Sequence, residues 1–244
     1  MSSLNSANQQ WQMLVFERFM EILQTPYGNF PAIWNLANAI NDAESLKQIG
    51  ELLSHHPTAK YAFHNRLLLG TIDVQQLHSL PKDTLGYAYA EHMLSNGFSP
   101  IQLPAIEHDY DYLMVHLTET HDIWHVVINA DTSMAGEIQL QAFVAAQLQI
   151  SRFSLAMLAK NLLKTAVEDL DLAEQHMDAL TTGWLMGKQA EPLFGIQWNT
   201  LWEKPLAQLQ TQWNILLDIP TTLGPARSTS NNSRNYVNFF EVST

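Results

Sequence analysis

The chain has no cysteine among its 244 residues, and this absence excludes several classes of site. Disulfide frameworks, thiolate zinc sites, iron–sulfur clusters and cysteine nucleophiles all require thiols. The sequence also lacks both common glycine-rich nucleotide motifs, GxGxxG and GxxxxGK[ST]. A dinucleotide held by a Rossmann fold, or a nucleotide held by a P-loop, is therefore not expected.

Basic residues are scarce, with 12 Lys and Arg against 24 Asp and Glu and a net charge of −12. This balance argues against a nucleic-acid partner and against electrostatic recruitment to anionic lipid. No apolar run reaches the roughly 18 residues of a transmembrane helix, and residues 1–10 lack the pattern of a signal peptide. We expect a cytoplasmic protein, and a peripheral membrane contact stays open.

Apolar residues recur with the period of an α-helix through most of the chain, and continuous β-branched strands are scarce. The pattern predicts helices over 11–22, from 31 onward, and over 42–53, 57–69, 73–80, 84–96, 106–128, a start within 131–133 to 150, 154–188 and 205–216. We therefore expect a single all-α domain of many helices over residues 1–220. Residues 221–244 form a polar tail without helical period, which we expect to be loosely ordered.

One predicted helix is apolar over much of its circumference, through Phe153, Leu155, Met157, Leu158, Leu162 and Leu163. Such a helix must be buried or must line an apolar groove between helices. A homodimer that buries surplus apolar surface is a further possibility.

The densest group of metal-ligand side chains is His121-Asp122-Ile123-Trp124-His125, followed by Glu137. Two histidines four residues apart share one face of a helix. On one straight helix Glu137 would be rotated about 160° from His121, but the break at 129–133 allows a bend that returns it. Two histidines and two carboxylates would suit a divalent ion. Ordinary helical histidines with surface carboxylates are the alternative interpretation.

The motif differs from HExxH, because it lacks the general-base glutamate of zinc peptidases. A peptidase is therefore disfavoured. The histidine ligands favour zinc or another transition metal, while the carboxylates leave magnesium and manganese open. Asp122 has two possible roles, as a direct ligand or as a residue that orients a histidine.

The HDxxHx(11)E pattern resembles that of the coenzyme Q (ubiquinone) biosynthesis protein 4 family. Three further blocks resemble the same family in the same order, namely LPKDTLGYAY at 80–89, GEIQLQAFVAAQ at 136–147 and the segment at 187–206. Together the blocks span about 80–216. One departure is the loss of arginines before the motif, where this chain has Val115, His116 and Thr118.

The resemblance implies an all-α fold and a role in quinone biosynthesis, with a prenylated lipid or quinone precursor and other biosynthetic proteins as partners. It also implies oxidative decarboxylation at C1 of a prenylated 4-hydroxybenzoate-type ring. Carried over by position, the metal and catalytic residues would be His121, Asp122, His125 and Glu137. A non-catalytic prenyl-lipid-binding scaffold is the alternative. A metal-dependent hydrolase of prenyl phosphates ranks last, because the chain lacks a basic cradle for phosphate.

Overall fold

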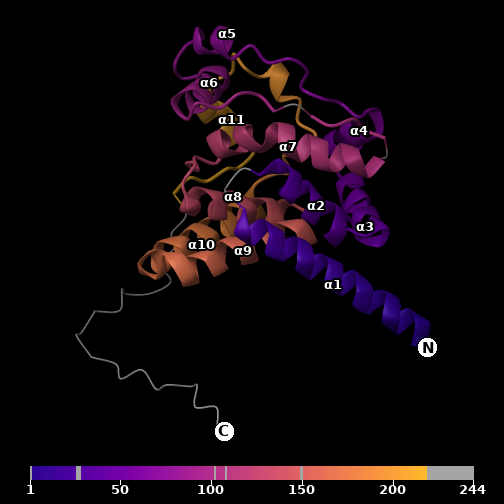
Figure 1. The fold of residues 1–244 in the computed structure, drawn as a ribbon. Coiled ribbons are helices and arrows are strands. Elements are labelled where there is room, and N and C mark those ends of the chain that lie inside the picture. Colours follow the sequence, from indigo (N-terminus) through magenta and orange to yellow (C-terminus); the bar gives the residue numbers. More distant parts are fainter. Residues whose placement is uncertain (1, 26–28, 102, 108, 149–150, 219–244) are drawn as a thin grey trace.

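Helix α7 (Asp109–Val127) crosses the middle of the molecule, and other helices lie on either side of it (Figure 1). The computed structural model describes residues 2–25, 29–101, 103–107, 109–148 and 151–218. Within these ranges the chain forms α-helices and two short 3-10 helices, and no strand, so the predicted all-α single domain is confirmed. The predicted tail lies outside the described residues.

The elements before α7 are α1 (Ser2–Gln24), α2 (Phe30–Ile40), α3 (Ala43–Ser54), α4 (Pro57–Asn65), α5 (Val74–His78) and α6 (Leu85–Ser95). Those after it are α8 (Met134–Gln147), α9 (Arg152–Glu168), η1 (Leu170–Leu172), α10 (Ala173–Gln189), η2 (Trp198–Thr200) and α11 (Leu206–Gln212). Helices α5, α6 and α11 lie on one side of α7, and α8, α9 and α10 lie on the other (Figure 1). Both faces of α7 are thus covered, which explains why most of its side chains are buried.

The largest core cluster joins these layers, since it contains Tyr89 and Met93 of α6, Trp124 of α7 and Phe143 of α8. Trp124 and Phe143 meet edge to face, with ring centroids 5.7 Å apart. Large aromatic side chains at this junction bury much apolar area and fix the spacing of α7 and α8. The site described below lies on the same two helices.

Helices α8 and α10 pack backbone to backbone because glycines stand at their contact. A Cβ on Gly183 would meet the carbonyl oxygen of Gln139 at 2.0 Å, and one on Gly187 would meet the carbonyl of Phe143 at 2.7 Å. Both distances are too short for any side chain. The four-residue spacing places both glycines on the face of α10 that touches α8.

Helix α6 is tied at its start to the segment before α11. The amides of Leu85 and Gly86 donate to the carbonyls of Lys204 and Trp202, and the amide of Leu206 donates to Asp83. Thr84 caps α6 by accepting from the amide of Tyr87. This joint orients α6, whose last turn reaches the site.

The predicted helix over 154–188 is wrong in one respect, because the structure divides it into α9 and α10. Asp169 ends α9 with φ −138° and ψ 50°, and η1 follows. Aspartate competes with helical hydrogen bonding through its own side chain, so a break there has a physical reason. The predicted helix over 57–69 also ends early, at Asn65, where Arg66 takes the left-handed conformation.

Within the described residues, none of the helices combines the length and the hydropathy needed to cross a bilayer.

Candidate metal centre

The corner between α7 and α8 is built from residues 128–136. Asn129 adopts φ 53°, and the amide of Ala130 donates to the carbonyl of His125, so that α7 ends there. Ser133 then caps α8 by accepting from the amide of Gly136. A Cβ on Gly136 would lie 1.9 Å from the carbonyl oxygen of Asp131, so only glycine fits this tight return.

The corner brings His121, His125 and Glu137 together, as the sequence predicts. The two Nε2 atoms lie 3.2 Å apart. Oε1 of Glu137 lies 3.4 Å from Nε2 of His125 and 3.8 Å from Nε2 of His121. Two ligand atoms about 2.1 Å from one tetrahedral ion lie roughly 3.4 Å from each other. The three donor atoms are therefore spaced to share one divalent ion.

The hydrogen bonding of His125 supports this interpretation. Its Nδ1 lies 3.2 Å from the carbonyl oxygen of Ala130, and that carbonyl can only accept. His125 thus carries a proton on Nδ1, and Nε2 is the nitrogen that faces the centre of the cluster. A backbone carbonyl behind a histidine is the usual support of a metal-bound imidazole.

The three side chains also bind one another electrostatically. Burial alone would raise the pKa of Glu137, but His121 and His125 hold that pKa well below its ordinary value. Burial alone would lower the pKa of His121, but Glu137 and Asp122 raise it above its ordinary value. The carboxylate is therefore ionised at neutral pH, as a metal ligand must be.

Asp122, the fourth residue predicted for the site, does not belong to the converging group. Its Oδ1 lies 3.6 Å from Nε2 of His92, which comes from the last turn of α6. The His92 ring stacks on that of His125, with centroids 5.7 Å apart and planes 24° apart. Sequence reasoning missed His92, because nothing in the local pattern of α6 indicates which residue of α7 it will meet.

His116 and Glu119, which precede the motif on α7, form a separate buried network. The Nδ1 atom of His116 lies 2.8 Å from Oε1 of Glu119, and Nε2 accepts from the amide of Gly195 at 3.1 Å. The other carboxylate oxygen of Glu119 accepts from the amide of Leu69. These two side chains tie α7 to two loops.

A buried lysine also interacts electrostatically with Glu137 of the cluster. Lys160 of α9 is 4% exposed. Burial lowers the pKa of Lys160 and neighbouring Lys164 lowers it further, while the charge of Glu137 opposes both. Lys160 thus places a buried amine within electrostatic reach of Glu137.

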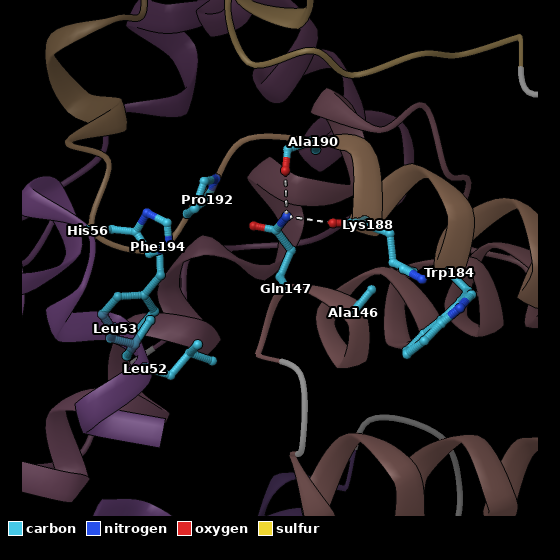
Figure 2. Close-up of a pocket in the computed structure, with 11 residues that line it drawn as sticks. Leu52, Leu53, His56, Ala146, Gln147, Trp184, Lys188, Ala190, Pro192 and Phe194 are labelled. Carbon is cyan, nitrogen blue, oxygen red and sulfur yellow. Dashed lines mark hydrogen bonds between the residues drawn. The ribbon is translucent and has the colours of Figure 1, made fainter. Parts of the chain in front are cut away.

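A pocket of about 360 Å³ opens where α3, α8 and α10 end, beside the segment 190–194 (Figure 2). Its lining is mostly apolar, and its basic side chains are His56 and Lys188. The amide nitrogen of Gln147 donates to the carbonyls of Gly187 and Ala190 and so fixes one wall. The sequence predicts that the apolar helix at 153–163 is buried or lines a groove, whereas the lining of this pocket comes from other segments. The pocket lies near the end of α8 opposite Glu137, about 15 Å along the helix axis.

Comparison with protein families gives one match over nearly the whole chain. The profile of the family described as "Coenzyme Q (ubiquinone) biosynthesis protein Coq4" matches residues 3–218. This range contains every described residue of the candidate site.

Curated relatives carry the name "Ubiquinone biosynthesis protein COQ4 homolog, mitochondrial". The protein of Anopheles gambiae is 28% identical over 160 residues, which are 64% of this chain and 55% of the relative. That of Danio rerio is 28% identical over 156 residues, which are 62% of this chain and 56% of the relative. The chain thus spans little more than half the length of these two relatives.

A solved structure shares the fold. The crystal structure of a Nostoc punctiforme protein, described as a ubiquinone biosynthesis protein, aligns with a TM-score of 0.75 at 24% identity. The alignment covers 85% of this chain and 98% of that one. At this identity the likeness establishes the arrangement of helices.

Proposed function

Because the chain belongs to the coenzyme Q (ubiquinone) biosynthesis protein Coq4 family, we propose that it acts on a prenylated aromatic acid in quinone biosynthesis with a divalent ion at His121, His125 and Glu137. The reaction proposed is oxidative decarboxylation at C1 of a 4-hydroxybenzoate-type ring. The bond between C1 and the carboxylate breaks to release carbon dioxide, and a hydroxyl group with its oxygen from water takes that place on C1. The two electrons and two protons released pass to dioxygen, which becomes hydrogen peroxide. Other quinone biosynthesis proteins are the proposed partners.

The observation that carries the proposal is the convergence of three donor atoms within 4.8 Å. Two imidazoles favour zinc or another transition metal over magnesium and manganese. When bound, such an ion supplies a Lewis acid for the oxygen atoms of the aromatic head group. Ala130 fixes the ring of His125, and the capped first turn of α8 positions Glu137, so the ligand set is preorganised.

The apolar pocket is the proposed binding site for the prenyl tail. An aromatic head at the metal centre and a tail directed along α8 would end near Leu53 and Phe194, which line the pocket. Burial of the tail would contribute about 0.8 kcal/mol for each CH₂ removed from water. Trp184, at 39% exposure, offers a further apolar surface there.

The test is elemental analysis with native mass spectrometry of purified protein, beside a His121→Ala/His125→Ala variant. The expected result is about one transition-metal ion per chain, lost from the variant. Glu51→Gln, a change on the exposed surface of α3, is the control and should retain the ion. Metal-loaded protein, a prenylated 4-hydroxybenzoate and dioxygen should then yield carbon dioxide. An absence of metal from the wild-type protein at millimolar zinc or cobalt would refute the proposal.

A non-catalytic scaffold that binds prenyl lipid is the second candidate, and the pocket is the observation that favours it. Pocket residues alone would then carry the function. A Leu53→Gln/Phe194→Ser variant would lose lipid and quinone synthesis, whereas Glu137→Gln would leave quinone synthesis intact. The enzymatic proposal makes the opposite prediction for Glu137→Gln, since that change removes an ionised ligand.

A further inference from the structure

We propose that His92 is a positioning residue that holds Asp122 beside the metal centre, so that an ion bound by His121, His125 and Glu137 keeps coordination positions open for oxygen donors. The inference rests on the proposed metal function and goes beyond it, because it assigns separate roles to Asp122 and to His92.

The first argument is where His92 lies. Its ring packs against two others, stacked on His125 and edge-on to Phe98 at a centroid distance of 6.0 Å. The side chain is only 11% exposed. Two aromatic contacts therefore fix the imidazole at the boundary between α6 and the ligand histidines.

The second argument is an unsatisfied polar atom. Nε2 of His92 is buried and has no hydrogen-bond partner among the described residues. The closest carboxylate oxygen that the structure gives it is Oδ1 of Asp122, at 3.6 Å. A buried donor without a partner is unfavourable, so a small movement that brings the two atoms together is favoured.

The third argument concerns Asp122 itself. Its side chain is 17% exposed, and its Oδ1 lies 3.6 Å from Nε2 of His92. Asp122 is not among the three residues whose donor atoms converge. His92 thus directs the carboxylate toward α6.

The consequence is chemical. A tetrahedral ion with four protein ligands is closed, whereas catalytic sites retain three protein ligands and an open position. Asp122 adjoins His121 in sequence and precedes His125 by three residues, so a change of rotamer would bring its carboxylate toward the cluster. By competing for that carboxylate, His92 determines whether the ion can accept a substrate oxygen.

The experiment uses full-length protein and cobalt(II), whose absorption spectrum reports coordination. Four variants are compared with the wild type, namely His92→Leu, His92→Gln, Asp122→Asn and His92→Leu/Asp122→Asn. Each is titrated with cobalt(II) against a chelator, and then with acetohydroxamate, a bidentate oxygen donor. Circular dichroism verifies that each variant is folded.

We expect His92→Leu to bind cobalt about tenfold more tightly, the lower end of what residues behind metal ligands change, and acetohydroxamate about tenfold more weakly. Its spectrum should shift as a protein carboxylate enters. His92→Gln keeps a donor for Asp122 and should resemble the wild type. Asp122→Asn should retain cobalt, and the double variant should lose the gain of His92→Leu.

Three results would overturn the inference. Asp122→Asn could lose cobalt as fully as His125→Ala does, which would make Asp122 a ligand of the wild type. His92→Leu could leave cobalt and acetohydroxamate binding unchanged, or could weaken cobalt binding. If His92→Leu fails to fold, Asp122→Asn and His92→Gln still decide the question. A wild type that binds no cobalt would instead refute the proposed function.

Discussion

Two buried polar side chains of α7, those of Glu119 and His116, connect this helix to two loops. The carboxylate of Glu119 is 6% exposed and has two partners, the imidazole of His116 and the amide of Leu69. His116 in turn accepts from Gly195. The series of hydrogen bonds that links Leu69 to Gly195 thus depends on the carboxylate of Glu119.

Replacing Glu119 with leucine should therefore destabilise the protein by about 3 kcal/mol, because two buried donors lose their acceptor. Glu119→Gln keeps one acceptor oxygen and should cost less. Glu51→Leu, at a carboxylate 64% exposed, serves as a surface control and should change stability by less than about 0.5 kcal/mol. Urea denaturation measures all three, and equal effects at Glu119 and Glu51 would disprove the network's importance.

The residues of the candidate site could be predicted from the sequence only where the contact between them is local. His121 and His125 lie one helical turn apart, and the break at 129–133 predicts a bend that brings Glu137 back toward them. The spacing alone therefore indicates a cluster. The approach of His92 depends on how α6 packs, which is set by the joint between Leu85 and Lys204. No local period encodes that joint.

Single elements were predicted where capping side chains stand at their starts. The predicted helix starts at 84 and within 131–133 coincide with the caps Thr84 of α6 and Ser133 of α8, and Asp42 caps α3. The break at Asp169 could not be predicted, because Leu170 and Leu172 continue the apolar pattern across it.

The close contact between α8 and α10 predicts that a larger residue at Gly183 will destabilise the protein. Gly183→Ala would place a methyl group against the backbone of Gln139, which cannot yield like a flexible side chain. We expect a loss of about 3 kcal/mol, as in overpacked cores. Gly50→Ala on α3 is the matched control, since its Cβ would meet only Phe63 at 4.0 Å. It should stabilise by about 0.5–1 kcal/mol, and thermal unfolding compares the two.

The N-cap of α3 should make the stability of the protein depend on pH. The amide of Ser45 and the guanidinium of Arg152, each at 2.8 Å, hold the pKa of Asp42 below its ordinary value. The stabilisation is therefore complete above the unfolded value of about 3.9, and it is lost as the pH falls through the folded value.

Replacing Asp42 with alanine should cost about 1 kcal/mol at pH 7 through loss of the cap. Asp42→Asn keeps an acceptor for Ser45 and should cost less, since an exposed ion pair with Arg152 contributes at most about 1 kcal/mol. The difference between wild type and Asp42→Asn should shrink as the pH falls below the unfolded pKa of about 3.9. Denaturation between pH 3 and pH 7 gives the comparison, and a difference independent of pH would contradict this account.

The molecule as a whole combines a net charge of −12 with an exposed apolar face on α1. Met13, Phe16 and Met20 are 69%, 63% and 51% exposed, and their spacing places them on one side of the helix. The all-α class followed from the helical period of the sequence. The way α1 extends from the body did not, because periodicity says nothing about which helices pack together (Figure 1).

If this face contacts a membrane, apolar burial rather than charge must drive the contact. We expect neutral phosphatidylcholine vesicles to bind the protein at least as well as vesicles with phosphatidylserine, and 0.5 M salt to leave binding intact. A Met13→Gln/Phe16→Gln/Met20→Gln variant should lose binding in co-sedimentation. Binding that requires anionic lipid would refute this expectation. A variant that instead turns a dimer into a monomer would assign the face to a second copy.

The candidate metal centre is short in sequence, since all three of its proposed ligands fall between His121 and Glu137. A loop this small costs little entropy to close, even in a chain that has lost its tertiary structure. An unfolded chain would therefore retain some affinity for the ion through its paired histidines. Affinity for the unfolded state subtracts from the gain that mass action gives the native state. The ion should accordingly raise the melting temperature by less than its affinity for the folded protein implies.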